Sequence, residues 1–382
     1  MNKLKTALPV LERLNAAGHE AYIVGGAVRN YLLGLPINDI DITTSALPDV
    51  VESLFSRTVP IGKEHGTIMV ITEDTFEVTT YRADGDYIDH RRPDHVIFVK
   101  ELKEDLIRRD FTVNAMALDE QMQVIDYVGG RADIERRLIR AVGIPRERFR
   151  EDALRMVRAA RFESVLDFAV EEATIDAMIS CAPLISHVAI ERIVTEIEKL
   201  LGGLSPSAGI RTLRDSGLIH DIPFFKDCQE LLVPDQALSL EVYIAYHLYR
   251  QWVTDRALPQ LKLSNESVHM IRAGTEILSV LDSQPDLAEL EMLVYRYSAE
   301  LIIECQTLTA DKSDIMTFWN NRRIHSRQDI QVDGHILMTH LNTGPGRWLK
   351  AALSAIEKEI VTGNLINSQE EILKWVDKHV EV

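Results

Sequence analysis

The sequence predicts an α+β protein in which an N-terminal mixed sheet is followed by an all-α second half. Residues 21–142 alternate strand-like stretches with helix-like stretches. From about residue 146 to the end, apolar residues recur with helical spacing, interrupted only by loop signals. The length of 382 residues is too great for one compact core and suits two to four domains.

The first elements form a strand, a helix and a second strand. The segment "AYIVGG" at 21–26 favours a strand, and "AVRNYLLG" at 27–34 favours a helix that Gly34 closes. The segment "INDIDIT" at 37–43 is rich in isoleucine and threonine, which favour a strand. We therefore expect a strand-turn-helix-strand unit at the start of the sheet.

A hairpin and a long loop follow a short helix predicted near 48–56. The segments "GTIMVI" and "TFEVTTYR" have the alternation of strands and are joined by a polar turn at Glu73-Asp74. Residues 84–95, "DGDYIDHRRPDH", carry glycine, proline and charge without apolar periodicity, which predicts a long mobile loop. Loops of that length inside a compact domain are often functional.

The composition predicts a soluble, globular and cytoplasmic protein. Hydrophobic residues make up 46% and charged residues 26% of the chain, and no apolar run approaches the ~20 residues that span a bilayer. The N-terminal "MNKLKTALPVLERLNAAG" predicts an amphipathic helix without a signal-peptide cleavage site. Cys181, Cys228 and Cys305 are far apart and form no CxxC pair, so neither a disulfide framework nor a zinc site is indicated.

Positive charge is concentrated in one stretch of an acidic chain. The net charge is -17, which taken alone argues against a nucleic-acid partner, because phosphates are bound mostly by lysine and arginine. The window 136–161 nevertheless holds nine arginines against three carboxylates. We expect this stretch to bind an anionic substrate.

The second strand carries two carboxylates on one face. Side chains alternate along a strand, so Asp39 and Asp41 point one way while Ile40 and Ile42 point into a core. The like charges would repel unless divalent cations bridge them. Paired metal ions are how polymerases activate an attacking hydroxyl and stabilise the leaving phosphate. The alternative is a solvated strand edge without a metal.

A glycine pair precedes the first helix. Gly25 and Gly26 lie between the predicted strand and helix, where glycine lets the backbone approach a phosphate and the first-turn N–H groups favour an anion. Arg29, one turn into the helix, can add a bidentate charge to the same phosphates. The alternative is an ordinary tight turn followed by a surface arginine.

Two further arginine-rich motifs follow. In "RRDFTVNAMALD" at 108–119, Arg109 and Asp110 are suited to triphosphate and ribose contacts, or form a solvated ion pair. In "REDALRMVRAARF" at 150–162, polar residues recur every three positions and wind slowly around a helix. We expect Asp152 and Arg155 to hydrogen-bond to each other and to present a donor and an acceptor along one edge. The alternative is a salt bridge between them without a role in binding. The series consists of Asp152, Arg155, Arg158 and Arg161.

Together these motifs resemble those of a known family. The strand-glycine-helix-strand-DxD order resembles the nucleotidyltransferase core of DNA polymerase β and its relatives, in which a neighbouring strand supplies a third carboxylate. Glu77 is the candidate, although a hairpin glutamate facing water is an equal alternative. The series "GGAVRNYLLG", "DID", "RRDFTVNA" and "EDALRMVRAARF" resembles the class II CCA-adding enzymes of the bacterial, Gram-positive type and their poly(A) polymerase relatives.

The resemblance implies a seahorse-shaped arrangement and a set of site residues. It implies a catalytic head at 1–143, a nucleotide-recognition neck at 144–203, a helical body at 204–290 and a tRNA-binding tail at 291–382. By the same likeness Asp39 and Asp41 are the ligands of Mg²⁺, and an Asp-Arg pair recognises the base of CTP or ATP. The nucleotide-binding residues it implies are Gly26, Arg29, Arg109, Asp152, Arg155, Arg158 and Arg161.

The activity that this resemblance implies is addition of C, C and A to tRNA 3′ ends without a template. CTP and ATP are the expected substrates, the tRNA acceptor arm is the expected partner, and the family is compatible with a homodimer. The loop at 84–95 corresponds to the family's mobile loop, whose presence favours addition of A as well as C. The alternatives are an A-adding tRNA enzyme, a poly(A) polymerase, a metal-dependent phosphohydrolase and a non-catalytic RNA-binding relative.

Overall fold

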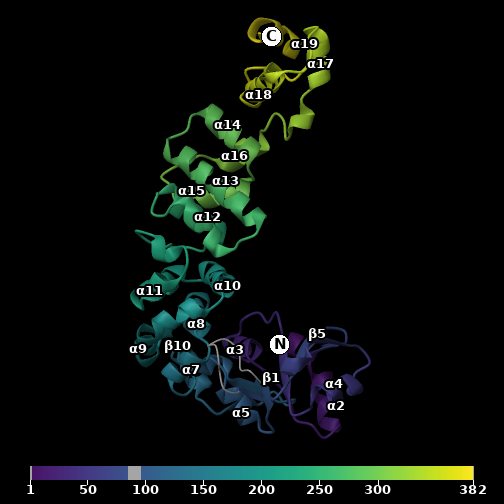
Figure 1. Ribbon diagram of the computed structural model, residues 1–382. Coiled ribbons are helices and arrows are strands. Elements are labelled where there is room, and N and C mark those ends of the chain that lie inside the picture. Colours follow the sequence, from purple (N-terminus) through teal and green to yellow (C-terminus); the bar gives the residue numbers. More distant parts are fainter. Residues whose placement is uncertain (1, 85–95, 382) are drawn as a thin grey trace. The chain divides into compact units, whose positions relative to one another are not determined.

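The computed structural model describes residues 2–84 and 96–381 (Figure 1). The loop predicted at 84–95 therefore lies, apart from its first residue, outside the described residues. The chain divides into two compact units. The first comprises Met1–Asp227, Val233–Ala237 and Ala257–Lys262, and the second comprises Cys228–Leu232, Leu238–Arg256 and Leu263–Val382.

A seven-stranded mixed sheet lies in the first unit, as the sequence predicts. Its strand order is β3-β4-β5-β2-β1-β8-β9. The pair β2–β5 is parallel and the other neighbours are antiparallel. The strands are β1 (Ala21–Val24), β2 (Asp41–Thr44), β3 (Thr58–Gly62), β4 (Thr67–Ile71), β5 (Thr75–Thr80), β8 (Met116–Leu118) and β9 (Val124–Asp126), with a separate hairpin of β6 (Arg82–Asp84) and β7 (Val96–Phe98).

Strand β2 begins later than the sequence suggests. Asp39 precedes the strand, which starts at Asp41, yet the expected alternation persists, with Ile40 and Ile42 buried and both aspartates exposed. The hairpin of β4 and β5 is confirmed by their antiparallel register. Because β2 and β5 are parallel, Asp41 lies opposite Glu77 in the sheet.

Besides α8 (Leu154–Leu166), eight α-helices of the first unit lie between residues 2 and 181 in the described part of the chain. The predicted N-terminal helix is broken into two, because Pro9 lies at the start of the second helix, a position where its missing N–H costs nothing. Gly34 closes α3 in the left-handed conformation (φ 68°), as expected. The helices are α1 (Asn2–Lys5), α2 (Leu8–Ala16), α3 (Gly26–Leu33), α4 (Pro48–Leu54), α5 (Leu102–Ile107), α6 (Gly130–Glu135), α7 (Pro145–Glu151) and α9 (Glu172–Cys181).

The arginine-rich segment is not one continuous helix. Asp152 has extended backbone angles (φ -139°, ψ 105°) between α7 and α8 (Leu154–Leu166), so it does not lie on the helical series with the three arginines. A short parallel strand pair joins β10 (Leu138–Ile139) to β11 (Ala169–Val170), and the helical periodicity after residue 146 does not predict β11. The remainder is helical, as expected.

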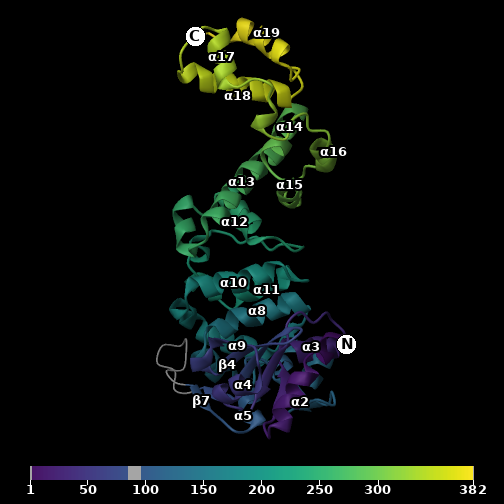
Figure 2. The ribbon, with the colours of Figure 1, turned by 90° about the vertical axis from the view of Figure 1, so that its right-hand side faces the viewer.

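Helix α8 packs against α10 (Ile190–Leu201) and α11 (Pro206–Asp215), as Figure 2 shows. Gly209 of α11 makes this packing close. A Cβ atom there would lie 2.7 Å from the carbonyl oxygen of Ala160 and 2.8 Å from Cγ of Leu200. Helices α10 and α11 therefore fix the position of α8, which carries three of the predicted site arginines.

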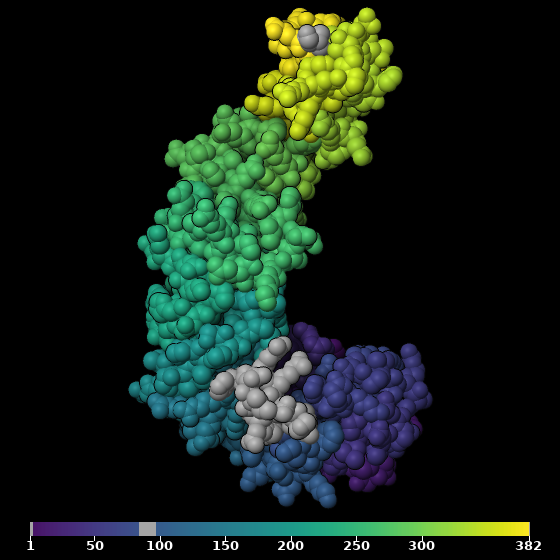
Figure 3. Space-filling view, viewed as in Figure 1, coloured from purple at the N-terminus to yellow at the C-terminus, as the bar shows by residue number. Residues whose placement is uncertain are grey.

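The second unit consists of helices, coloured green to yellow in the space-filling view of Figure 3. Its C-terminal core includes buried Leu337, Ile356, Ile372 and Val376. Among the helices that the structure describes, none is long and apolar enough to cross a membrane. The helices are α12 (Leu240–Tyr249), α13 (Asn265–Asp282), α14 (Leu287–Arg296), α15 (Ala299–Gln306), α16 (Ile315–Asn320), α17 (Gly334–His340), α18 (Arg347–Val361) and α19 (Gln369–His379).

A buried histidine joins a loop to α12. The side chain of His247 donates from Nδ1 to the carbonyl oxygen of Tyr243 at 2.7 Å, and its Nε2 accepts from the N–H of Leu232 at 3.3 Å. Burial lowers the pKa of His247 to about 4, while the hydrogen bond to Tyr243 opposes that effect. The neutral imidazole is therefore part of the folded core.

We predict that Gly209→Ala destabilises the first unit, because the added methyl group meets a backbone carbonyl that cannot move without displacing α8. The expected loss in free energy of unfolding is about 1–3 kcal/mol, measured by urea denaturation followed by circular dichroism. Gly202→Ala is the matched control, because Gly202 has φ -80° and its added Cβ meets nothing closer than 3.7 Å. Equal denaturation midpoints for the two variants would contradict the packing argument.

We also predict that the second unit loses stability as pH falls from about 6.5 towards 4. The pKa of His247 is lower in the folded chain than in the unfolded chain, so below pH 6.5 the unfolded state binds a proton that the folded state does not. The full effect is about 3 kcal/mol. Urea denaturation followed by tryptophan fluorescence measures it, because all four tryptophans of the chain lie in the second unit. The effect should be absent from His247→Gln.

Candidate active site

A cavity of about 570 Å³ in the first unit brings most of the predicted site residues together. It is bounded by the sheet end, by the start of α3 and by α8 and α10. Eight of its lining residues are arginines, against three aspartates. The lining residues are Gly25, Gly26, Arg29, Asp41, Arg82, Arg108, Arg109, Asp110, Asn114, Asp152, Leu154, Arg155, Arg158, Arg161, Phe162 and Arg192.

The turn before α3 requires glycine. Gly25 has a φ of 74°, and a Cβ atom there would lie 3.4 Å from Nη1 of Arg109 and 3.5 Å from Oδ2 of Asp41. A side chain would therefore be strained and would occupy the space between a carboxylate and a guanidinium. The first-turn N–H groups of α3 border the same space at Gly26, as the glycine pair predicts.

Asp41 lies where two hollows meet. It lines the large cavity and also an adjoining hollow of about 340 Å³ that Asp39 and Glu77 line. Asp41 reaches solvent, but the surrounding cavity walls partly desolvate its carboxylate and raise its pKa. The Arg109 charge opposes this, and the negative charge of Asp39 adds to it. Burial and the charges of Asp41 and Asp39 likewise raise the pKa of Glu77.

These three carboxylates form an open set of ligands. Within residues 2–84 and 96–381, no three histidine, cysteine, aspartate or glutamate side chains are grouped closely enough to hold a metal ion by themselves. Hard divalent cations such as Mg²⁺ are usually held by one or two carboxylates, with water and substrate phosphates as the other ligands. Asp39 and Asp41 fit that kind of site, and they repel each other without a cation.

Arg29 is held from two sides and carries a destabilised charge. Its Nη1 donates to Oδ1 of Asn114 at 2.6 Å, and its guanidinium carbon lies 5.3 Å from the ring centre of Phe162. Burial lowers the pKa of Arg29 to about 10, and repulsion from Arg161 adds to that effect. An anion in the cavity would relieve this repulsion.

Arg109 faces the cavity from the other side. Its Nη2 contacts Oδ2 of the fully buried Asp105 at 3.2 Å. Its Nε is buried and has no hydrogen-bond partner among the described residues. Arg109 therefore retains donor capacity towards a bound phosphate.

A network of ion pairs supports the α8 arginines. Arg158 donates from Nε and Nη2 to Oδ2 of Asp110 at 2.8 and 2.6 Å, and Arg161 lies 2.9 Å from Oε2 of Glu196. Burial opposes ionisation of Asp110, but the Arg158 charge outweighs it and lowers the pKa to about 2. The ribose contact predicted for Asp110 stays a prediction, because Arg158 holds this carboxylate here.

The predicted pairing of Asp152 with Arg155 is wrong for this structure. Oδ2 of Asp152 accepts from Nη2 of Arg192 at 2.9 Å, whereas Nη1 of Arg155 donates to Glu151 at 2.6 Å. The physical reason is the break between α7 and α8, which removes Asp152 from the helical register. Asp152 and Arg155 nevertheless line the same cavity.

Sequence reasoning missed several cavity residues. Asn114 lies within the quoted motif "RRDFTVNA", so its position could have suggested its role. Arg192 and Glu196 lie about 40 residues after the α8 motif, and only tertiary packing brings them to the site. The i,i+4 spacing of Arg192 and Glu196 on one helix is the only local signal.

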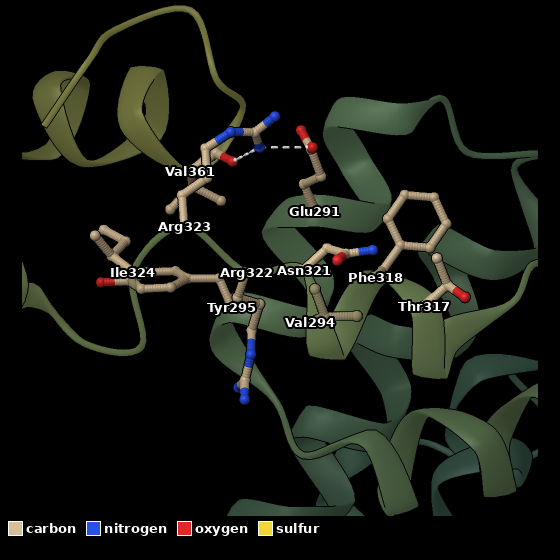
Figure 4. A pocket seen from close by; sticks show the side chains of 10 residues that line it. All are labelled: Glu291, Val294, Tyr295, Thr317, Phe318, Asn321, Arg322, Arg323, Ile324 and Val361. Carbon is tan, nitrogen blue, oxygen red and sulfur yellow. Dashed lines mark hydrogen bonds and ion pairs between the residues drawn. The ribbon is translucent and has the colours of Figure 1, made fainter.

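A second cavity, in the other unit, lacks the arginine cluster and the aspartates of the first (Figure 4). Its volume is about 170 Å³. The guanidinium of Arg323 is already neutralised by Glu291 at 2.7 Å and also donates to the carbonyl oxygen of Val361. We therefore assign the chemistry to the arginine-rich cavity.

Comparison with known proteins identifies the family of the chain. Residues 21–140 match the family model of the poly A polymerase head domain, residues 243–376 match that of tRNA nucleotidyltransferase domain 2, and residues 167–228 match "Probable RNA and SrmB- binding site of polymerase A". The CCA-adding enzyme of Staphylococcus aureus (strain Newman) is 43% identical over 394 residues, covering 98% of each chain.

The solved structures that this chain resembles are also CCA-adding enzymes. The Bacillus stearothermophilus CCA-adding enzyme in complex with CTP has a TM-score of 0.85 and 34% identity, covering 97% of this chain and 96% of that one. The Thermotoga maritima CCA-adding enzyme complexed with tRNA is similar in fold, with a TM-score of 0.67, 20% identity and coverage of 100% and 96%. The chain belongs to the CCA-adding enzymes, a family of tRNA nucleotidyltransferases.

Proposed function

We propose that this chain adds C, C and A to the 3′ end of tRNA from CTP and ATP without a nucleic-acid template. Family membership supports this function, as does the structural relative that was solved with CTP. The observation that carries it is one cavity lined by eight arginines and three aspartates, of which Asp41 also faces the adjoining hollow that Asp39 lines. A nucleoside triphosphate would add negative charge beside the arginines, and its metal ion would add positive charge beside the carboxylates.

The triphosphate would be held by backbone and guanidinium groups together. The N-terminus of α3 offers N–H groups at Gly26, and Arg29 and Arg109 offer donors on either side of the Gly25 turn. Arg158 and Arg161 extend the positive charge along α8. These contacts orient the α-phosphate towards Asp41, and positioning of that kind supplies much of the rate enhancement in phosphoryl transfer.

Asp39 and Asp41 would hold Mg²⁺, with Glu77 as the third carboxylate. When bound, the metal neutralises charge on the phosphates and lowers the pKa of the attacking tRNA 3′-hydroxyl. The two aspartates would fix that hydroxyl in line with the leaving pyrophosphate. The donor chemistry of the pair and the raised pKa of Asp41 support this role.

The base would be selected by protein side chains. Asp152 offers carboxylate lone pairs and Arg155 offers guanidinium donors to the same cavity. Cytosine and adenine both present an exocyclic amino group next to a ring acceptor, which such a pair can bind. Because Asp152 and Arg155 are held by different partners, each can move without the other when the enzyme changes from C to A.

The wider expectations follow from this function. We propose a cytoplasmic location, because tRNA and nucleoside triphosphates are cytoplasmic substrates. We further propose that the chain has four domains, with boundaries after residues 143, 203 and 290, and that residues 291–382 bind tRNA. We also propose that the protein forms a homodimer.

We predict that a tRNA transcript lacking its last three nucleotides gains two residues with CTP alone and three with CTP and ATP. The reaction contains Mg²⁺ and is resolved at single-nucleotide length on a gel. Addition of one A only to tRNA ending in CC would instead identify an A-adding enzyme. A long tail from ATP would identify a poly(A) polymerase.

We predict that Asp41→Asn lowers the rate of nucleotide addition at least about 10³-fold, because a neutral amide is a poor ligand for a hard cation. Binding of tRNA, measured by filter retention, should change less than about twofold because the variant removes no RNA contact. Asp49→Asn is the control, since Asp49 is 84% exposed and pairs with Lys63 at the surface, away from the cavity. A near-normal rate in Asp41→Asn would exclude a metal-binding role.

A further inference from the structure

Arg192 contacts Asp152 across two separate elements. It is the third residue of α10, whereas Asp152 lies in the extended segment between α7 and α8. The guanidinium Nη2 lies 2.9 Å from Oδ2 of Asp152, and both residues line the arginine-rich cavity. The other terminal nitrogen of Arg192, Nη1, is buried and has no hydrogen-bond partner in the described part of the chain.

The Asp152 carboxylate is held at both oxygens. Oδ1 accepts from the backbone N–H of Leu154 at 3.0 Å, and Oδ2 accepts from Arg192. A carboxylate oxygen can accept two hydrogen bonds, so one acceptor site on each oxygen remains for a ligand. Without Arg192 the carboxylate would keep only its contact with the local backbone and could turn about its side-chain bonds.

Arg155 does not supply this restraint. Its Nη2 donates to the carbonyl oxygen of Arg108 at 3.0 Å, and its Nη1 donates to Glu151 at 2.6 Å. The two residues proposed to recognise the base are therefore positioned independently. Arg192 is the side chain that positions Asp152.

Helix α10 supports both ends of the bound nucleotide in the proposed function. Arg192 holds the base-recognition carboxylate, and one turn later Glu196 contacts Arg158 and Arg161 at 3.5 and 2.9 Å. Glu196 is buried, so these contacts are shielded from water. A single rigid helix thus sets the distance between the carboxylate and the phosphate-binding arginines.

We propose that Arg192 is a positioning residue for nucleotide selection, holding Asp152 so that its free lone pairs accept only from a base with an amino group at C4 of a pyrimidine or C6 of a purine. Cytosine and adenine carry that amino group, whereas uracil and guanine carry a carbonyl oxygen there, which a fixed carboxylate repels. This inference rests on the proposed CCA addition and concerns its specificity.

The test compares CTP with UTP in the first addition to tRNA that lacks CCA. The steady-state kcat/KM is measured for each nucleotide with wild type, Arg192→Met and Arg192→Lys. We expect the CTP:UTP ratio to fall at least about tenfold in Arg192→Met, mainly through the KM for CTP. Arg192→Lys keeps a charge but lacks the planar fork, so we expect a loss of about threefold.

Arg214→Met is the matched control. Arg214 also pairs with an aspartate, Asp215, at 2.8 Å in the same unit, but it is not a cavity residue. Its CTP:UTP ratio should equal that of wild type. Thermal unfolding of all variants is followed by circular dichroism, so that a loss of folded protein is not mistaken for a loss of selectivity.

The outcomes separate this inference from the function on which it rests. Equal losses for CTP and UTP in Arg192→Met, or an unchanged ratio, would overturn the selective role and leave CCA addition intact. If Arg192→Met does not fold, the lysine variant decides, and a wild-type ratio there overturns the inference. A wild-type protein that adds no nucleotide would overturn the proposed function, and the inference with it.

Discussion

The ion pair between Arg158 and Asp110 holds the site together. Asp110 precedes strand β8 of the sheet and is only 9% exposed, whereas Arg158 belongs to helix α8. The same guanidinium also lies 3.5 Å from Glu196 of α10. Loss of either partner of the buried pair would leave an uncompensated charge, at a cost of about 3–5 kcal/mol. The end of the sheet that carries Asp41 is thereby fixed to α8 and α10, whose residues line the same cavity.

The distribution of charge explains how an acidic protein can bind polyanions. The chain has a net charge of -17, yet eight arginines line one cavity. Asp105, Asp110 and Glu196 neutralise some of them at short distance and fix their geometry. Arg29 has no such carboxylate partner among the described residues, and its charge is opposed by that of Arg161. Net charge is therefore a poor guide to substrate, whereas local clustering is a good one.

Sequence alone predicted the features that depend on local spacing. Alternation along the strand placed Asp39 and Asp41 on one face, and the glycine pair placed a tight turn beside them, because both effects act over a few residues. The Asp152–Arg155 pair could not be predicted correctly, because one extended residue between two helices changes the register. Arg192 was not identified, because 40 residues separate it from Asp152 and no periodic signal links them. Pro9 likewise ended the first helix earlier than its apolar pattern suggests.

The unbalanced positive charge of the cavity also affects how the reaction ends. Pyrophosphate consists of the phosphate groups that Arg29 and Arg109 would bind in the triphosphate. The cavity is therefore suited to bind the pyrophosphate product as well as the nucleotide substrate. Binding sites that stabilise both sides of a phosphoryl transfer allow it to run in either direction. The finished 3′ end would then be exposed to pyrophosphorolysis. Net tRNA maturation would therefore depend on how quickly the cell hydrolyses pyrophosphate.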